Sequence, residues 1–239
     1  MTPSICVRSF GLLIAVLSCL HGSAQFVVER SPWLDGDAVT EEPVQQNWAV
    51  VNQHTTELID AELTVEGLNP RKPVRLQVDR GTTLELAPFR RYGRLCVEPN
   101  FMLYADYIYA DPEVPADTLL LEPLAVGLET SLPAIEFMPG TEDLYFTSVP
   151  ALEALRDFIE VNPTVSLAII GHDGEDAAAP DRSSRNRARA VFEYLVSSGV
   201  SANRLSVEGR GASQRLYPHP STPEEAEANR RISIRVTNY

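Results

Sequence analysis

The chain has 239 residues, with 20 Lys and Arg against 33 Asp and Glu, and a formal net charge of −13. Apolar residues make up 44% of it and charged residues 22%, which is typical of a folded protein and excludes a collagen-like or disordered chain. The acidic balance argues against a protein that binds nucleic acid or an anionic membrane through its charge. We therefore expect no nucleic acid among its partners.

The first residues have the pattern of a secretory signal peptide. Arg8 precedes an apolar run over 10–20, and small residues follow at 22–24. The run is shorter than the roughly 20 apolar residues that span a hydrocarbon layer. We expect residues 1–24 to be the signal peptide, cleaved after Ala24, and the mature protein to be exported. A second interpretation remains open, because the segment ending in Cys19 resembles a bacterial lipobox, which makes Cys19 a candidate for lipidation.

The cysteines indicate export without an internal disulfide. Cys6 and Cys19 lie in the leader, which leaves Cys96 alone in the folded part. Its apolar, strand-like neighbours favour a buried and inert thiol over a nucleophile.

The mature chain is predicted to start with an exposed lead-in followed by a β-domain. Residues 25–46 combine prolines, glycine and acids without a period. Over 47–126, short runs rich in Val, Leu, Thr and Tyr alternate in polarity and are separated by turn residues. The aromatic stretch 101–109 is apolar on both faces, which favours a strand inside the domain over a carbohydrate platform. This pattern predicts an N-terminal all-β, antiparallel sandwich of the immunoglobulin-like architecture.

After Pro123 the pattern changes to helices that alternate with strands. Ser148 can cap a helix that ends near Val161, with apolar residues on one stripe. A continuous apolar run over 164–170 then predicts a strand that is buried on both faces.

The second half of this domain repeats the alternation. After a loop over 171–183, Ser184 can cap a helix that ends near residue 198, with Gly199 in the left-handed C′ position. Strands are expected over 205–208 and 232–236, with a helical turn between them. Residues 127–239 thus predict a C-terminal α/β domain of βαβαβ type, whose mixed sheet contains a parallel pair joined by a helix.

Several short pieces of this domain, taken in order, resemble the OmpA-like C-terminal domain family. They are Ile169-Ile170-Gly171-His172, Ser184-x-x-Arg187-Ala188, Tyr194-Leu195, Gly199-Val200, Arg204-Leu205, Gly209-x-Gly211 and Asn229-Arg230-Arg231. The resemblance covers roughly residues 130–239. The segment 121–127 also resembles the lead-in found where such a domain follows a carboxypeptidase-regulatory or transthyretin-like sandwich.

The resemblance implies a domain that binds the peptidoglycan stem peptide through its diaminopimelate, without cleaving it. This ligand presents an ammonium group beside a carboxylate. As third residue of its helix, Arg187 would point back toward the free N–H groups and take the carboxylate. Asp173, with Asp176 in reserve, is the candidate partner of the ammonium group. The candidate ligand-binding residues are Asp173, Arg187, Ser184, Arg231 and Asn229.

The loop after Gly171 departs from the family pattern. The family usually reads Gly-His-Thr-Asp, whereas this chain reads Gly171-His172-Asp173-Gly174, and Pro180 stands where the family has Asn. Arg187 could instead form an ordinary surface ion pair with Asp173 or Asp181. The alternative function is therefore an envelope scaffold or adaptor, whose diverged OmpA-like domain binds a protein partner instead of peptidoglycan.

Enzymatic and metal-dependent functions have little support. His172 stands beside several acids, but without a second histidine at metal-ligand spacing. Ser183 and Ser184 lack a nucleophile elbow and a His–acid relay, so helix capping explains them better. We expect no cofactor, no metal and no catalysis. The protein is predicted to be a non-enzymatic tether to peptidoglycan, in the periplasm or associated with the outer membrane of a diderm bacterium.

Overall fold

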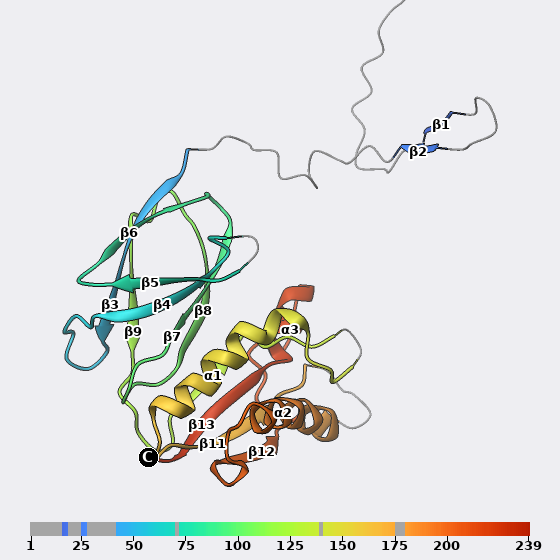
Figure 1. Cartoon of the computed structure of the whole chain (residues 1–239). Helices are drawn as coiled ribbons and strands as arrows, with labels where there is room; N and C mark the ends of the chain where they lie inside the picture. The colour runs from blue at the N-terminus through green and yellow to red at the C-terminus, as the bar shows by residue number, and fades with distance from the viewer. Residues whose placement is uncertain (1–15, 19–24, 28–41, 70–71, 139–140, 175–179) are drawn as a thin grey trace, which may run out of the picture. The chain divides into compact units, whose positions relative to one another are not determined.

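The computed structural model describes residues 16–18, 25–27, 42–69, 72–138, 141–174 and 180–239 (Figure 1). The chain divides into two compact units, Met1–Glu41 and Glu42–Tyr239. The first unit holds a short antiparallel pair of strands, β1 (Val16–Ser18) and β2 (Gln25–Val27). The cleavage point after Ala24 and the lipidation candidate Cys19 lie outside the described residues, so both stay predictions.

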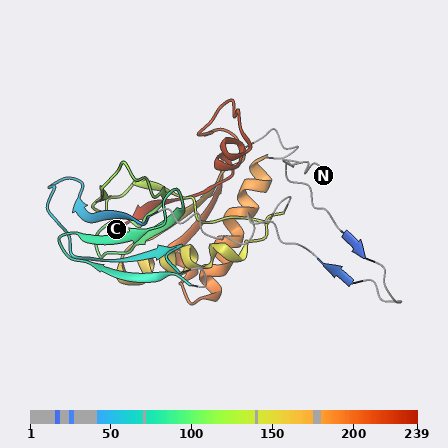
Figure 2. The same ribbon diagram turned by 90° about the horizontal axis from the view of Figure 1, so that it is seen from above.

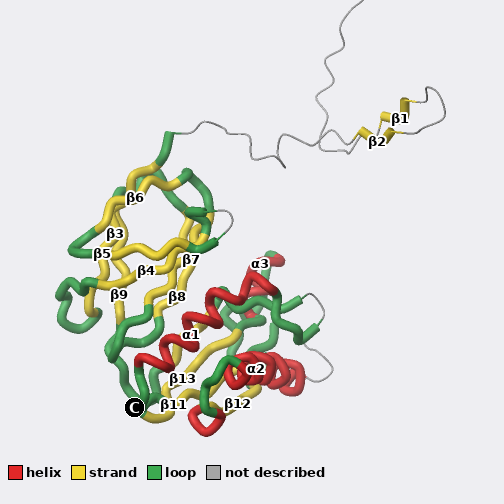
Figure 3. Tube along the Cα trace, viewed as in Figure 1, coloured by secondary structure: helices red, strands yellow, loops and turns green. Residues whose placement is uncertain are grey.

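The second unit opens with strands that form two sheets, drawn in yellow in Figure 3. One sheet has the order β6-β3-β9 and the other the order β5-β4-β7-β8. Their bounds are β3 (Val44–Asn52), β4 (Ala61–Glu66), β5 (Val74–Val78), β6 (Thr82–Leu86), β7 (Arg91–Cys96), β8 (Tyr104–Tyr109) and β9 (Ala116–Leu121). One pair departs from the predicted antiparallel pattern, because β3 and β9 run parallel.

The two sheets share one hydrophobic cluster. Trp48 and Leu63, on β3 and β4, are buried in it together with residues of β6, β7 and β9. Burial in β3 alternates from residue to residue, as expected where one face of a strand packs on a core. Cys96 lies in the same cluster, and burial raises the pKa of its thiol to about 12. The thiol is therefore protonated and inert at neutral pH, as the sequence predicts.

Arg94 connects the two sheets through a buried guanidinium group. Its Nη2 lies 2.6 Å from Asp106 Oδ2 on β8, and its Nη1 lies 2.6 Å from Asp117 Oδ2 on β9. The guanidinium carbon also lies 5.1 Å from the centre of the Trp48 ring. One cation thus holds an aspartate from each sheet.

We expect Arg94→Leu to destabilise the protein by about 3 kcal/mol, because both aspartates then lose their cation in a partly dry environment. Chemical denaturation with urea measures the loss. The matched control is Arg75→Leu, since Arg75 forms an exposed pair with Glu62 at 3.3 Å. That change should cost less than about 1 kcal/mol. Equal losses in the two variants would contradict a structural role for Arg94.

The rest of the unit alternates helices with strands in a single mixed sheet of order β10-β13-β11-β12. The elements are β10 (Glu129–Leu132), α1 (Val149–Val161), β11 (Ser166–Gly171), α2 (Pro180–Ser197), β12 (Leu205–Gly209), α3 (Pro223–Asn229) and β13 (Ile232–Asn238). Two short 3₁₀ turns, Phe146–Ser148 and Ala202–Arg204, precede α1 and β12. Strands β11 and β12 are parallel and α2 joins them, as predicted, while β13 runs antiparallel to β11 and β10.

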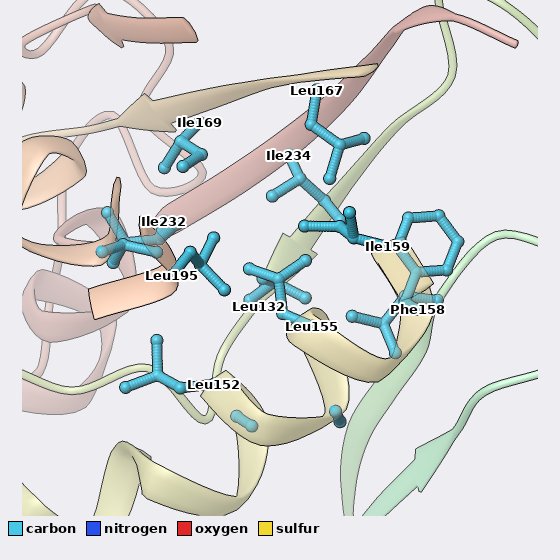
Figure 4. Packing of buried hydrophobic residues seen from close by; sticks show 14 of the residues in the cluster. Leu132, Leu152, Leu155, Phe158, Ile159, Leu167, Ile169, Leu195, Ile232 and Ile234 are labelled. Carbon is cyan, nitrogen blue, oxygen red and sulfur yellow. The ribbon is translucent and has the colours of Figure 1, made fainter. Parts of the chain in front are cut away.

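Helices α1 and α2 lie next to each other in both views of the chain (Figures 1 and 2). Their apolar side chains meet those of the sheet in one cluster (Figure 4). Leu155 and Phe158 of α1, Leu195 of α2, Leu167 of β11 and Ile234 of β13 lie in this cluster. Strand β11 is buried along almost its whole length, as its apolar run predicts.

The β-rich part of the unit shares this core. Leu95 at the end of β7, Met102 and Leu103 before β8, and Leu124 after β9 belong to the same cluster as the helices. The backbone N–H of Asn100 also donates to Asn162 Oδ1 at the end of α1, at 2.9 Å. Glu42–Tyr239 is accordingly one compact unit. The predicted boundary between 47–126 and 127–239, and the immunoglobulin-like or transthyretin-like type of the first part, stay predictions.

The capping of α1 and the start of α2 differ from the prediction. Ser148 holds the N-cap position of α1, but its side chain makes no capping bond and instead bonds the backbone N–H and C=O of Glu136. Helix α2 begins at Pro180, so Ser184 lies inside the helix and does not cap it. Proline favours this start because its fixed φ suits the first helical position and it has no N–H to leave unpaired.

Candidate functional site

The candidate site lies where the chain leaves β11, at the carboxyl end of the parallel strands. A Cβ at Gly171 would lie 1.8 Å from the backbone oxygen of Ser184, so the end of β11 and helix α2 touch backbone to backbone. A Cβ at Gly174 would lie 2.8 Å from the backbone oxygen of Ala226 in α3. These two glycines allow residues 172–174 to lie against both helices.

Asp173 and Arg187 form an ion pair in this loop. Arg187 Nη2 lies 2.6 Å from Asp173 Oδ2, and both residues are only 5% exposed. Asp173 Oδ1 accepts from the N–H of Gly174, and Arg187 Nη2 donates to Ser183 Oγ. Within the described part of the chain, Asp173 Oδ2 and Arg187 Nε have no hydrogen bond of good geometry. The pair is therefore closely matched in charge but incomplete in hydrogen bonding.

Ser184 and Gly211 fix this loop against the neighbouring strand connection. Ser184 is fully buried, and its Oγ accepts from the N–H of Gly211 at 3.0 Å. The backbone N–H of Asp173 donates to the carbonyl of the same Gly211 at 2.7 Å. Ser184 thus positions the loop that carries Asp173.

Asn229 and Arg231 hold the other side of the loop. Asn229 is fully buried at the end of α3, and its side-chain amide bonds both the N–H and the C=O of Tyr217. The backbone carbonyl of Arg231 accepts from the N–H of His172. The side-chain Nη2 of Arg231 donates to the carbonyl of Gln214. Burial lowers the pKa of the Arg231 guanidinium from its ordinary value. The side chains of both residues therefore hold the backbone of the segment around Gln214 and Tyr217.

His172 is a buried, neutral histidine. Its Nε2 lies 2.8 Å from Ser233 Oγ, and that hydroxyl donates to Glu129 Oε1. The histidine therefore donates from Nε2, and Nδ1 carries the lone pair. Burial first, and the nearby Arg231 second, lower the pKa of His172 to about 4.

This shift predicts a loss of stability in acid. The unfolded chain binds the proton near pH 6.5 and the folded one only near pH 4, so the stability is present above 6.5 and is lost as the pH falls toward 4. At about 1.4 kcal/mol per pKa unit, we expect a loss of about 3 kcal/mol from this group. Urea denaturation at pH 7, 6, 5 and 4 measures this loss in the wild type and in His172→Gln. The difference between the two proteins separates the contribution of His172 from that of the carboxylates, which both proteins share. Parallel curves for the two proteins would contradict the assignment.

The structure brings Asp173, Arg187 and Ser184 together, and packs Asn229 against Gly174. Two expectations are corrected. Arg187 is not in the first turn of its helix, because α2 starts at Pro180, and so the free N–H groups do not lie beside it. The pair with Asp173 is buried, whereas the alternative interpretation expected a surface pair. Asp176 and the side chains of Pro180 and Asp181 lie outside the described residues.

Two residues of the site were not foreseen. Phe137 lies beside Arg187, with the guanidinium carbon 5.8 Å from the ring centre. Gly211 bonds both Asp173 and Ser184. The Gly209-x-Gly211 motif could have indicated the second contact, but no sequence signal links Phe137 to a helix that starts some forty residues later.

The described residues hold neither a candidate metal site nor a membrane-spanning helix. Within them, no group of three or more His, Cys, Asp or Glu is placed to hold a metal ion. None of their helices is long and apolar enough to cross a membrane.

Comparison with known proteins gives one family match. Residues 136–230 match the model of the OmpA family. No curated protein matches the chain.

Solved structures that match part of this chain include the periplasmic domain of Helicobacter pylori MotB, at 19% identity and a TM-score of 0.44, over 49% of this chain and 80% of that one. An outer membrane protein from Borrelia burgdorferi B31 matches at 18% identity and a TM-score of 0.35, over 46% and 87%. The cell wall anchor of the T6SS from Pseudomonas aeruginosa matches at 22% identity and a TM-score of 0.37, over 43% and 75%.

The family match coincides with the described helices and strands from the segment before α1 to the end of α3. It contains the loop after β11, both members of the Asp173–Arg187 pair, and Ser184. Residues 136–230 of this chain are an OmpA-like domain.

Proposed function

We propose that the protein is a non-enzymatic tether of the bacterial cell envelope. Its OmpA-like domain binds the diaminopimelate of the peptidoglycan stem peptide at the Asp173–Arg187 pair. The observation that carries this proposal is the pair itself, which places an anion and a cation next to each other with 5% exposure. A ligand with an ammonium group beside a carboxylate is the chemical complement of such a pair.

Binding would proceed by exchange of partners. The ligand ammonium group replaces Arg187 at Asp173 Oδ2, and the ligand carboxylate takes the guanidinium group of Arg187, including Nε. Both atoms lack a hydrogen bond among the described residues, so the exchange adds bonds that the pair alone does not make. The total charge of the site stays balanced throughout, which limits the cost of desolvation.

Ser184, Asn229 and Arg231 act as positioning residues in this proposal. Ser184 fixes the loop through Gly211, and Asn229 lies beside Gly174, where an added Cβ would come within 3.2 Å of the Asn229 Cβ. Arg231 lies beside His172 and adds positive charge behind the loop. This charge favours an anionic ligand group near Arg187.

The location follows from the same proposal. We infer export by the predicted signal peptide, or anchoring through Cys19, to the periplasmic side of the envelope of a diderm bacterium, with outer-membrane association. The β-rich part, proposed to be a transthyretin-like or immunoglobulin-like sandwich over 47–126, shares the core of the anchored domain and would be held next to it. Its own partner would be another envelope protein.

One observation favours the adaptor alternative. Asp173 and Arg187 are in contact at 2.6 Å, so the pair satisfies itself electrostatically without a ligand. In that case the domain would keep the family fold and bind a protein partner instead of the stem peptide.

Calorimetric titration of residues 25–239 with a diaminopimelate-containing stem tetrapeptide tests the proposal. We expect saturable binding that the double variant Asp173→Asn/Arg187→Gln weakens at least about tenfold. The same peptide with lysine in place of diaminopimelate lacks one carboxylate and should bind more weakly. No binding at millimolar peptide, with the protein shown to be folded, would reject the proposal and leave the adaptor alternative.

A further inference from the structure

A groove lies between helix α2 and the outer edge of the mixed sheet. It has a volume of about 330 Å³ and is lined by Arg185, Arg189 and Phe192 of α2 and by Val207 of β12. Phe192 and Val207 are partly buried against the core of the domain, so they form an apolar floor. The two arginines are exposed. The groove is thus apolar inside and cationic at its rim.

Strand β12 has an unpaired edge along this groove. It is the last strand in the sheet order β10-β13-β11-β12, and Figure 1 shows it at the border of the sheet beside α2. On its outer side, its backbone has no partner strand among the described residues. Exposed edges are often protected by lysine or proline, whereas β12 has the sequence Leu-Ser-Val-Glu-Gly. This edge can therefore accept an added strand.

The charge of α2 indicates that the added strand is acidic. The first half of α2 carries Arg182, Arg185, Arg187 and Arg189, in a chain whose formal net charge is −13. Arg185 makes no hydrogen bond or ion pair within the described part of the chain. Arg189 pairs with Glu193 at 2.8 Å, but both side chains are more than 60% exposed. A ligand carboxylate can therefore replace Glu193 at little cost.

The spacing of the two arginines matches that of an extended peptide. Arg185 and Arg189 are separated by one turn of α2, which is about 6 Å along the helix axis. Alternate residues of a strand face the same side and lie about 7 Å apart. Two acids with one residue between them can therefore each contact one arginine. An apolar side chain two residues further along then reaches Phe192, which lies about 10 Å beyond Arg185.

The topology sets the direction of the added strand. Strands β11 and β12 are parallel and α2 joins them, so α2 runs opposite to both. A strand antiparallel to β12, the more stable kind of pairing, runs from Arg185 toward Phe192 and has the order acid-x-acid-x-apolar. Glu208 of β12 does not oppose these acids. It lies on the face opposite Val207, where its carboxylate pairs with Arg235.

We propose that the groove between α2 and β12 is a docking site for an extended acidic segment of another protein, which joins the sheet as a strand antiparallel to β12. The carboxylates of this segment pair with Arg185 and Arg189, and its apolar side chain covers the floor of the groove. The surface is distinct from the Asp173–Arg187 pair, because Arg185 and Arg187 lie about 200° apart around α2. The inference is therefore independent of the proposed function.

Fluorescence anisotropy with a labelled, end-capped peptide Thr-Glu-Thr-Glu-Thr-Val-Thr, titrated with residues 25–239, tests this site. We expect saturable binding that weakens at least about fivefold in Arg185→Gln/Arg189→Gln, or when both glutamates of the peptide become glutamine. N-methylation of the third and fourth residues of the peptide, which removes N–H groups on both sides of the strand, should weaken binding about tenfold.

The control variant Arg75→Gln/Arg182→Gln removes two exposed arginines that do not line the groove, and its affinity should stay within about twofold of the wild type. Circular dichroism and thermal unfolding confirm that both double variants are folded, as expected for exposed side chains.

Four outcomes would overturn the docking site. Absence of saturable binding rejects it. Equal affinity for the original, glutamine and N-methylated peptides means that neither the charges nor strand pairing contribute. Competition by an excess of the stem tetrapeptide places the labelled peptide at the Asp173–Arg187 pair instead. A wild-type dimer in sedimentation that Arg185→Gln/Arg189→Gln disrupts assigns the edge to a second copy of this chain.

Discussion

Gly171→Ala is expected to destabilise the protein by about 4 kcal/mol or more, which would leave little of the stability of a typical domain. The new Cβ would lie 1.8 Å from the Ser184 oxygen and 2.6 Å from its carbonyl carbon. Both atoms are backbone in the middle of contacts between α2 and β11, so neither can rotate away. The helix would have to shift as a whole, and the core between helix and sheet would open with it.

Thermal and urea unfolding measure this effect, with Gly93→Ala as the matched control. Gly93 also lies in a strand, but the atoms nearest to its added Cβ are Tyr107 Cε1 at 2.9 Å and Glu66 Oε2 at 3.0 Å, both at the ends of side chains. Such ends can move aside, so we expect a cost of about 1 kcal/mol there. A loss of similar size in both variants would show that α2 is not tightly packed on β11.

The elements that the sequence predicts best are those whose pattern and packing agree. The stripe of α1 and the apolar run of β11 both face one core, and both elements lie within two residues of their expected bounds. Gly199 has the expected positive φ of 100° after α2. In these segments local preference and burial favour the same conformation.

The predicted start of α2, at Ser184, was wrong because two sequence signals for a helix start lie close together. Ser184 has the residue type of an N-cap, and apolar residues at helical spacing follow it. Pro180, however, suits the first position of a helix, and the helix gains a turn by starting there. Burial decides the outcome, because the Ser184 hydroxyl bonds Gly211 across the domain and is not available for a cap.

The candidate site could be predicted in its residues but not in its geometry. The sequence names Asp173 and Arg187, yet a spacing of fourteen positions through an irregular loop does not determine whether they touch. Their contact depends on the close approach of β11 to α2 at Gly171 and on the bonds of Gly211, which join parts of the chain far apart in sequence. The shared core of the two parts of the unit is long-range in the same way, because Leu95 and Met102 carry no sign of a partner after residue 127.

The second large effect is expected from substitutions of the Asp173–Arg187 pair. These substitutions distinguish the contribution of the pair to folding from its contribution to ligand binding. We expect Arg187→Gln alone, and Asp173→Asn alone, each to cost about 3–4 kcal/mol, because the remaining charge is then buried without a partner. The double variant should recover most of this loss, since it leaves no buried charge. The coupling between the two substitutions would then be about 2 kcal/mol or more in a double-mutant cycle measured by urea unfolding.

The exposed pair Arg189–Glu193, on the same helix at 2.8 Å, is the control cycle, and its coupling should stay below about 0.5 kcal/mol. Similar coupling in the two cycles would contradict the burial of Asp173 and Arg187. In the proposed tether, the double variant is folded but cannot offer a charge to either end of a diaminopimelate headgroup. Stability should therefore return in the double variant while binding of the stem peptide does not, a combination that a purely structural ion pair cannot produce.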